Sequence, residues 1–215
     1  MMKYLLRTLL CLPFGLLASC CANDSCNCND LLADSLYFQF DTSQFQASDI
    51  DTVYLFRYST SDSTRAIDSV QLTRRQLVAN IKRLKDAKQL PATFNADSSI
   101  VILSNNAPFS PTTTGGKLSQ YNYRLSVPQG NSRYGPAGRP QRRPAYNYRL
   151  GPIIIRGQYK ADGCCTCYEN TSKTVVVSTN FLAIRRAFYD ATEESGAGNS
   201  SSQPTRQPVP IVLHR

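Results

Sequence analysis

The pentapeptide Tyr-Asn-Tyr-Arg-Leu occurs twice in the chain, at residues 121–125 and 146–150. Successive side chains of a strand point to opposite faces, so both tyrosines and the leucine of each copy share one face, and asparagine and arginine share the other. We therefore expect two neighbouring strands, the arms of a long hairpin. Twelve tyrosines, nine phenylalanines and frequent valine, isoleucine and threonine also favour strands over a helical bundle.

Other apolar stretches extend this pattern. Residues 52–58 are apolar on both faces and fit a central strand. Residues 181–189 fit either a helix or a strand. Together these stretches predict a mainly β fold, a two-sheet sandwich of immunoglobulin- or transthyretin-like type with about seven strands. The other expected strands are residues 36–40, 99–103, 153–155 and 173–177.

One segment has the periodicity of a helix. Thr73 and Gln76 fit a capping box, and Leu77, Ile81 and Leu84 follow at helical spacing. This pattern predicts one amphipathic basic helix at about residues 74–87. Its cations either are solvated on the outside of a helix that covers the sheet or face a phosphate-rich surface. They are Arg74, Arg75, Lys82, Arg83, Lys85 and Lys88.

The amino-terminal residues have the features of an export signal. Lys3 and Arg7 precede an apolar run from Thr8 to Ala18, which is shorter than the ~20 residues of a membrane-spanning helix. The run ends in Leu17-Ala18-Ser19-Cys20, which resembles the lipobox of bacterial lipoproteins at all four positions.

The lipobox resemblance implies where the mature protein resides. Residues 1–19 would be a lipoprotein signal peptide, and Cys20 would carry the diacylglycerol and start the mature chain. Two or more acyl chains, such as palmitate, anchor a protein stably in a membrane. We expect a protein of the bacterial envelope that is anchored in the outer membrane. The sequence does not indicate whether the domain faces the periplasm or the cell surface.

Six further cysteines form two clusters in the mature chain. An even number of thiols in an oxidising compartment favours disulfides, although six cysteines allow fifteen pairings. The matched clusters predict at least one disulfide between residues 21–28 and residues 164–167, which lie near a turn between two late strands. The alternative is a thiolate site for zinc or copper(I). The paired cysteines within each cluster are adjacent or separated by one residue, whereas structural zinc sites usually have two to four residues between paired ligands. The disulfide candidates are Cys21, Cys26, Cys28, Cys164, Cys165 and Cys167.

Charge is unevenly distributed. Residues 20–68 carry eight aspartates against two arginines, whereas residues 69–160 carry fifteen lysines and arginines against two aspartates. These segments either neutralise each other or leave a basic surface for a polyanion such as an anionic glycolipid or polysaccharide. We expect no specific nucleic acid partner.

The loop between the two pentapeptides, residues 128–145, is rich in proline, glycine and arginine. Arginine suits phosphate and carboxylate because its planar fork donates two hydrogen bonds at once. If the protein has a recognition element for a polyanion, this loop is the candidate; the alternative is a long surface loop tolerated without function. The candidates are Arg133, Arg139, Arg142 and Arg143.

Catalysis is not predicted. The sole histidine, His214, lies in a segment expected to be a tail, which argues against histidine-based catalysis, a Ser-His-Asp triad and a histidine metal site. Asp49 and Asp51 fit solvated turn residues better than the carboxylate pair of a glycosidase. We expect no enzyme, no cofactor and no resident metal.

Four Asp-Ser/Thr triplets resemble the acceptor of a bacterial general O-glycosylation system. Chance is the alternative, since Asp-Ser is common at turns. The acceptor candidates are Ser35, Thr52, Ser63 and Ser69.

The predicted organisation is a signal at 1–19, a single β-rich domain at 20–190 and a disordered tail at 191–215, in which residues 209–213 could add an edge strand. We expect a membrane-anchored, non-catalytic envelope lipoprotein with a binding or structural role toward an unknown protein or glycan. Alternatives are a polyanion-binding module that uses the Arg-rich loop and a thiol-ligated metal-binding protein.

Overall fold

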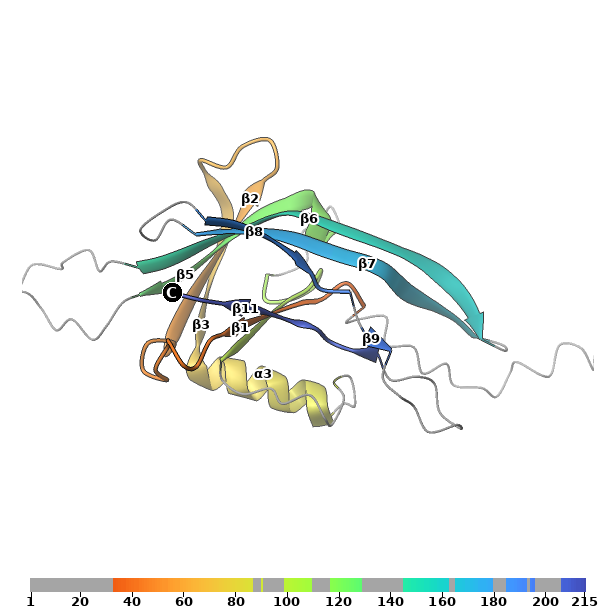
Figure 1. Ribbon diagram of the computed structural model, residues 1–215, viewed down its shortest axis with the longest axis horizontal. Helices are drawn as coiled ribbons and strands as arrows, with labels where there is room; N and C mark the ends of the chain where they lie inside the picture. Colours follow the sequence, from red (N-terminus) through yellow and green to blue (C-terminus); the bar gives the residue numbers. More distant parts are fainter. Residues whose placement is uncertain are drawn as a thin grey trace, which may run out of the picture.

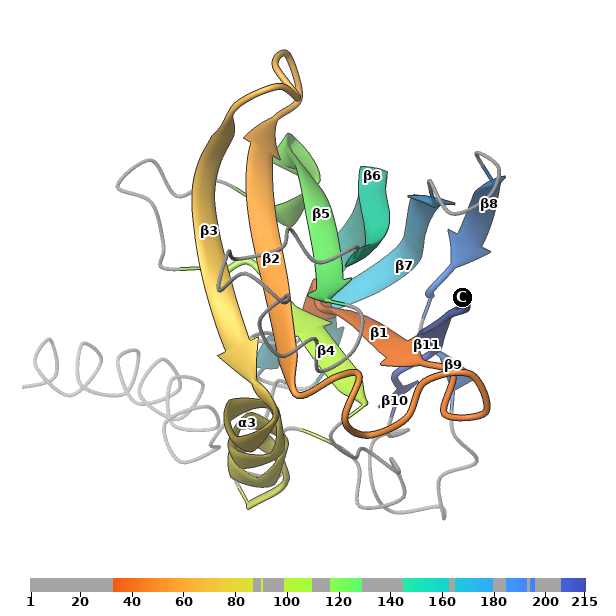
Figure 2. The same ribbon diagram turned by 90° about the vertical axis from the view of Figure 1, so that its left-hand side faces the viewer.

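A computed structural model describes residues 33–86, 90, 99–109, 117–128, 145–162, 165–179, 185–192, 194–195 and 206–215. These residues form a mainly β fold with two packed sheets and the helix α3 (Arg74–Asp86), as Figures 1 and 2 show. The two-sheet β-sandwich predicted from the sequence is confirmed.

The larger sheet is an antiparallel meander of six strands in the order β3-β2-β5-β6-β7-β8. The smaller sheet has the order β11-β1-β4, and β9 and β10 form a separate short ladder. The strands of the large sheet are β2 (Thr52–Ser59), β3 (Ala66–Thr73), β5 (Tyr121–Pro128), β6 (Ala145–Asp162), β7 (Cys165–Thr179) and β8 (Arg185–Asp190). The others are β1 (Leu36–Phe40), β4 (Ile100–Leu103), β9 (Glu194–Ser195), β10 (Arg206–Gln207) and β11 (Pro210–Leu213), and a 3-10 turn, η1 (Leu118–Gln120), precedes β5.

The main core lies between the two sheets. Phe38 and Phe40 of β1 are fully buried there against Leu55 of β2 and Leu125 of β5. Burying a side chain of this size stabilises the fold by roughly 1.5–3 kcal/mol, so the alternating apolar positions of these strands hold the sheets together.

The helix α3 covers the other face of the small sheet. Ile81 of α3 packs with Tyr37 of β1 and Ile100 of β4 in a second cluster of buried residues. The predicted capping box is present, since the backbone N–H of Thr73 donates to Oε1 of Gln76 at 2.8 Å and the N–H of Gln76 donates to Oγ1 of Thr73 at 3.4 Å. The layers are therefore large sheet, small sheet and helix, and no described helix or strand covers the outer face of the large sheet (Figure 1).

The two copies of the pentapeptide are neighbouring strands, as predicted. Leu125 of β5 pairs with Tyr148 of β6, and Tyr123 pairs with Leu150. The strand β6 continues past the second copy through Gly151, where the sequence predicted a separate strand. Gly151 has φ +137°, and a Cβ at this position would collide with the side chain of Asn122. Glycine therefore lets one strand run through the irregularity.

The structure differs from the sequence prediction, or completes it, in three segments. The strand β3 (Ala66–Thr73) was not among the strands expected from the sequence; Leu72 is its one buried residue, and Val70 packs against the main core. The segment at 181–189 contains the strand β8. The domain also does not end at 190, because β11 pairs in parallel with β1, and Ile211 and Leu213 are buried in the main core. The edge strand expected at 209–213 is thus confirmed.

Candidate functional site

The outer face of the large sheet is the candidate site, and we call it the open face. Strand alternation places Leu55 in the core and its neighbours Tyr54 and Phe56 on the open face. Three large apolar side chains remain exposed there, namely Ile67 (54% exposed), Ile154 (44%) and Phe188 (68%). The open face also carries four arginines, which are Arg124, Arg149, Arg156 and Arg186.

Three of these arginines lie on one line across the sheet. Arg124 of β5 pairs directly with Arg149 of β6, Arg149 pairs with Ser178 of β7, and Ser178 pairs with Arg186 of β8. We call Arg124, Arg149 and Arg186 the arginine rung. Like charges directly opposite each other on adjacent strands are destabilising. Among the described residues, no carboxylate forms a salt bridge with any arginine of the rung.

Aromatic rings hold the first arginine of the rung. The guanidinium carbon of Arg124 lies 4.5 Å from the ring centroid of Phe56 and 5.5 Å from that of Tyr58. Its Nε is buried without a hydrogen-bond partner. The rings attract the guanidinium through cation–π interactions but accept no conventional hydrogen bond from it. The two rings therefore hold the guanidinium of Arg124 in place.

A second stacked arginine lies on the core side of the sheet. The guanidinium carbon of Arg57 is 4.9 Å from the ring centroids of both Phe109 and Tyr121. Its Nη2 donates to Oδ2 of Asp68 at 3.3 Å, and the residue is only 5% exposed. Arg57 therefore already has its counter-ion inside the domain.

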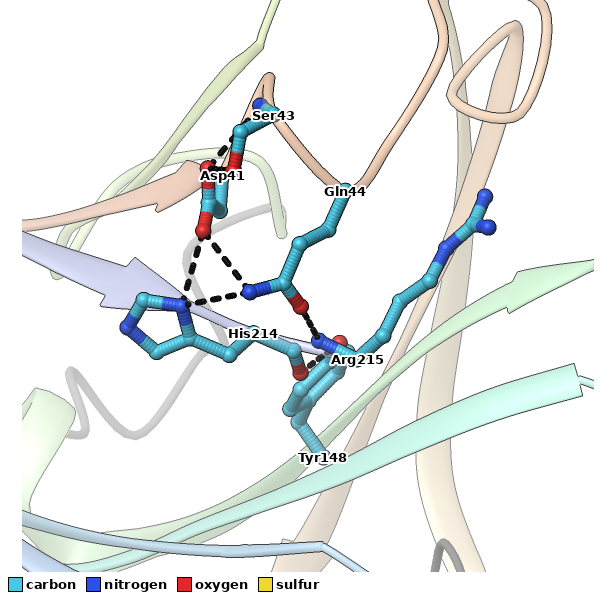
Figure 3. A network of polar contacts seen from close by, with 6 residues as sticks. All are labelled: Asp41, Ser43, Gln44, Tyr148, His214 and Arg215. Carbon is cyan, nitrogen blue, oxygen red and sulfur yellow. Dashed lines mark hydrogen bonds and ion pairs between the residues drawn. The ribbon is translucent and has the colours of Figure 1, made fainter.

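A polar network at the carboxyl terminus is a feature that the sequence did not reveal (Figure 3). Nδ1 of His214 lies 2.9 Å from Oδ2 of Asp41, and Oγ of Ser43 donates to Oδ1 of Asp41 at 2.6 Å. The hydrogen bonds from the Ser43 hydroxyl and backbone, aided by His214, hold the pKa of Asp41 below its ordinary value. The Ser43 hydroxyl bonds to the carboxylate, so the imidazole is not placed to take its proton as in a Ser-His-Asp triad.

This network fastens the last residues instead. Tyr148 donates its hydroxyl to the carbonyl of His214 at 2.8 Å, and the N–H of Arg215 donates to Oε1 of Gln44 at 2.7 Å. The Arg215 guanidinium also pairs with Asp49. The expectation of a disordered tail is therefore wrong for the final residues, because contacts with residues 41–49 and with β6 secure them.

Side chains of β7 hold the first described residues of the chain. Lys173 is fully buried, and its Nζ donates to the carbonyls of Ala33 at 2.9 Å and Ser35 at 3.1 Å. Asn170 donates to the Ala33 carbonyl as well. The first described residues are thus held by the strand that begins at Cys165. The predicted disulfide clamp joins residues 21–28 to 164–167, and residues 21–28 lie outside the described residues, so the clamp stays a prediction.

Most residues predicted from the sequence lie outside the described residues. These are Cys20, Cys21, Cys26, Cys28, Cys164, Arg133, Arg139, Arg142 and Arg143. Cys165 and Cys167 lie in the first residues of β7, opposite Asp162 and Lys160 at the end of β6. They therefore lie near the turn between these strands, as predicted.

The four glycosylation candidates differ in accessibility. Ser35 is 1% exposed, so its hydroxyl is not available for modification in the folded domain. Thr52 is half-buried at the start of β2, whereas Ser63 and Ser69 are exposed. The prediction for Ser35 is therefore corrected, and the other three positions stay predictions.

The described part of the chain has neither a metal-binding cluster nor a membrane-spanning helix. Its histidine, cysteine, aspartate and glutamate side chains form no cluster of three or more that could hold a metal ion. None of its helices is long and apolar enough to cross a membrane.

Comparisons with known proteins gave no match. No protein-family model matches the sequence, and neither a curated protein nor a solved structure matches the chain. Function is therefore inferred from the residues and their geometry.

Proposed function

We propose that the protein is a membrane-anchored envelope lipoprotein that acts by binding rather than by catalysis. Cys20 carries the lipid that tethers it, and the domain presents the open face to a partner. The observation that carries this proposal is the composition of that face, which combines exposed Ile67, Ile154 and Phe188 with four arginines. Exposed large apolar side chains beside arginine are typical of binding surfaces.

The described residues of α3, on the opposite side of the domain, include one exposed large apolar side chain in place of three. The exposed side of α3 carries cations such as Arg75, Lys82 and Arg83, and Val78 is its exposed large apolar residue, at 47%. Isolated apolar residues on a charged helix surface are ordinary and indicate no partner. Val78 therefore provides a matched control for the open face.

The test uses the mature chain with Cys20→Ser, which carries no lipid. Its co-sedimentation with washed bacterial envelopes should fall at least about tenfold in the Ile154→Ser/Phe188→Ser double variant, because truncated anchors of an interface typically cost more than 1 kcal/mol each. The Val78→Ser variant should sediment like the parent chain. Equal sedimentation of all three would overturn the binding role of the open face.

The anchor is tested separately. Wild-type protein made in a Gram-negative host should fractionate with membranes and incorporate labelled palmitate, and the Cys20→Ser variant should do neither. Palmitate incorporation that persists in the variant would contradict the assignment of Cys20.

A further inference from the structure

We infer that the ligand of the open face is an acidic polysaccharide, whose charged groups lie on the arginine rung. This inference rests on the proposed binding role of that face. It moves the predicted polyanion site from the loop at 128–145 and from α3 to Arg124, Arg149 and Arg186.

The geometry of the rung favours an extended anion over a single small one. Neighbouring strands lie about 4.8 Å apart, so Arg149 is about 5 Å from Arg124 and about 10 Å from Arg186 when measured across the sheet. The three side chains therefore form a line of positive charge on β5, β6 and β8. A chain molecule with repeated negative groups can contact all three arginines at once, and it would also relieve the repulsion between Arg124 and Arg149.

The open face carries more positive than negative charge, which complements an acidic ligand. Arg156 adds a fourth positive charge, and Asp190, two positions after Phe188 at the end of β8, contributes a carboxylate to this face. Oδ1 of Asp190 accepts hydrogen bonds from the N–H and hydroxyl of Thr192, which engage this carboxylate within its own turn. Glu169, further along the β6–β7 hairpin, lies 3.8 Å from Lys160.

The neutral groups beside the rung favour a sugar over other polyanions. Asn147 pairs with Ser126 next to Arg124 and Arg149, and these amide and hydroxyl groups can hydrogen-bond to sugar hydroxyls. Phe188 offers an exposed ring for the apolar side of a sugar. A single-stranded nucleic acid requires several free rings for its bases, but the rings of Phe56 and Tyr58 are already stacked on Arg124.

The experiment measures binding of the full mature protein, in neutral detergent, to polygalacturonate, with uncharged dextran for comparison. The variant Arg124→Gln/Arg149→Gln/Arg186→Gln should lose about a hundredfold in affinity at physiological ionic strength, since charge-assisted hydrogen bonds are among the strongest polar contacts. The control Arg75→Gln/Lys82→Gln/Arg83→Gln removes the same charge from α3 and should stay within twofold of wild type. No protein should bind dextran.

A conservative variant separates geometry from charge. The substitutions Arg124→Lys, Arg149→Lys and Arg186→Lys together keep the charge but remove the planar fork, so affinity should fall by about tenfold and remain measurable. Circular dichroism and thermal unfolding establish that the variants are folded.

Four outcomes would overturn the inference. Equal loss in the rung and α3 variants would indicate diffuse charge attraction. Stronger rung-dependent binding to a single-stranded DNA of matched charge, or to phosphatidylglycerol vesicles, would assign the face to a nucleic acid or to a lipid surface. If no polyanion binds but Ile154→Ser/Phe188→Ser still abolishes envelope co-sedimentation, the ligand class is wrong and the binding role stands. If neither effect is seen, both proposals fail.

Discussion

Arg57 and Arg124 are stacked in similar ways on opposite faces of the same sheet. Each guanidinium lies near two aromatic rings, with ring distances between 4.5 and 5.5 Å. Arg57 is buried and has Asp68 as its counter-ion, whereas Arg124 is half-buried and lies opposite another arginine, Arg149.

The difference shows that stacking alone does not decide what an arginine does. On the core side, an internal carboxylate balances the charge, so Arg57 serves the stability of the domain. On the open face, among the described residues, no carboxylate forms a salt bridge with the rung, and the proposed polysaccharide would supply the missing negative charge. Stability and binding should therefore respond differently to changes at the two sites.

The largest expected effect is on stability at the core side. Arg57→Leu should lower the free energy of unfolding by about 2 kcal/mol, the value of a desolvated cation–π contact, because Phe109 and Tyr121 lose their stacked guanidinium. Arg124→Leu should cost about 1 kcal/mol or less, the value of an exposed cation–π contact. Urea unfolding followed by circular dichroism measures both. Equal losses would remove the distinction between the two arginines.

The next effect tests whether the missing counter-ion matters. Arg149→Glu places a carboxylate opposite Arg124 and makes its environment resemble that of Arg57. Affinity for polygalacturonate should fall about a hundredfold, and the free energy of unfolding should rise by about 0.5 kcal/mol, because an opposed like-charge pair becomes an opposite-charge pair. Unchanged affinity in a binding titration would show that the rung does not hold the anion.

Alkaline pH should lower the free energy of unfolding through a tyrosine on the core side of the sheet. Burial raises the pKa of Tyr123, which lies near Arg57 and donates its hydroxyl to the carbonyl of Leu118 at 3.3 Å. The folded state therefore keeps this tyrosine neutral, and its contribution to stability is complete below about pH 10, the unfolded pKa of tyrosine, and is lost as pH rises above it.

The loss from Tyr123 should approach about 1.4 kcal/mol for each pH unit above 10. Tyr123→Phe should reduce this slope in urea unfolding measured between pH 9 and about pH 11. A slope that is the same in the variant would place the alkaline sensitivity elsewhere.

The smallest effect concerns the ring under Arg124. Phe56→Leu removes a cation–π contact of about 0.5–1 kcal/mol, so affinity for polygalacturonate should fall by about three- to fivefold as the guanidinium becomes less well fixed. Val78→Ser on α3 is the control and should bind like wild type. Full affinity in the Phe56 variant would mean that stacking does not prepare Arg124 for its ligand.

Much of the fold was predictable from local patterns. The alternation in the two pentapeptides predicted β5 and the first part of β6 as neighbours, and it placed Arg124 and Arg149 on the face away from the core. The capping box and apolar stripe predicted α3. These features depend on residues close together in the sequence, where strand and helix periodicity carry the information.

The rest depends on contacts between distant residues. The sequence did not show that the small sheet and α3 cover one side of the large sheet and that the described elements leave the other side open. It missed Arg186, because the segment that contains β8 fitted a helix as well as a strand. His214 was assigned to a tail because its partner Asp41 lies 173 positions away in the chain. Side-chain periodicity does not reveal contacts of this kind.

Arginine footprinting tests the central claim most directly. Phenylglyoxal modification of each arginine, quantified by mass spectrometry with and without saturating polygalacturonate, reports which guanidiniums the ligand covers. Protection should be strongest at Arg124, Arg149 and Arg186, while Arg75 and Arg83 on α3 should react at unchanged rates. Equal protection on α3, or unchanged reactivity of the rung under saturation, would contradict the assignment of the open face as the polyanion site.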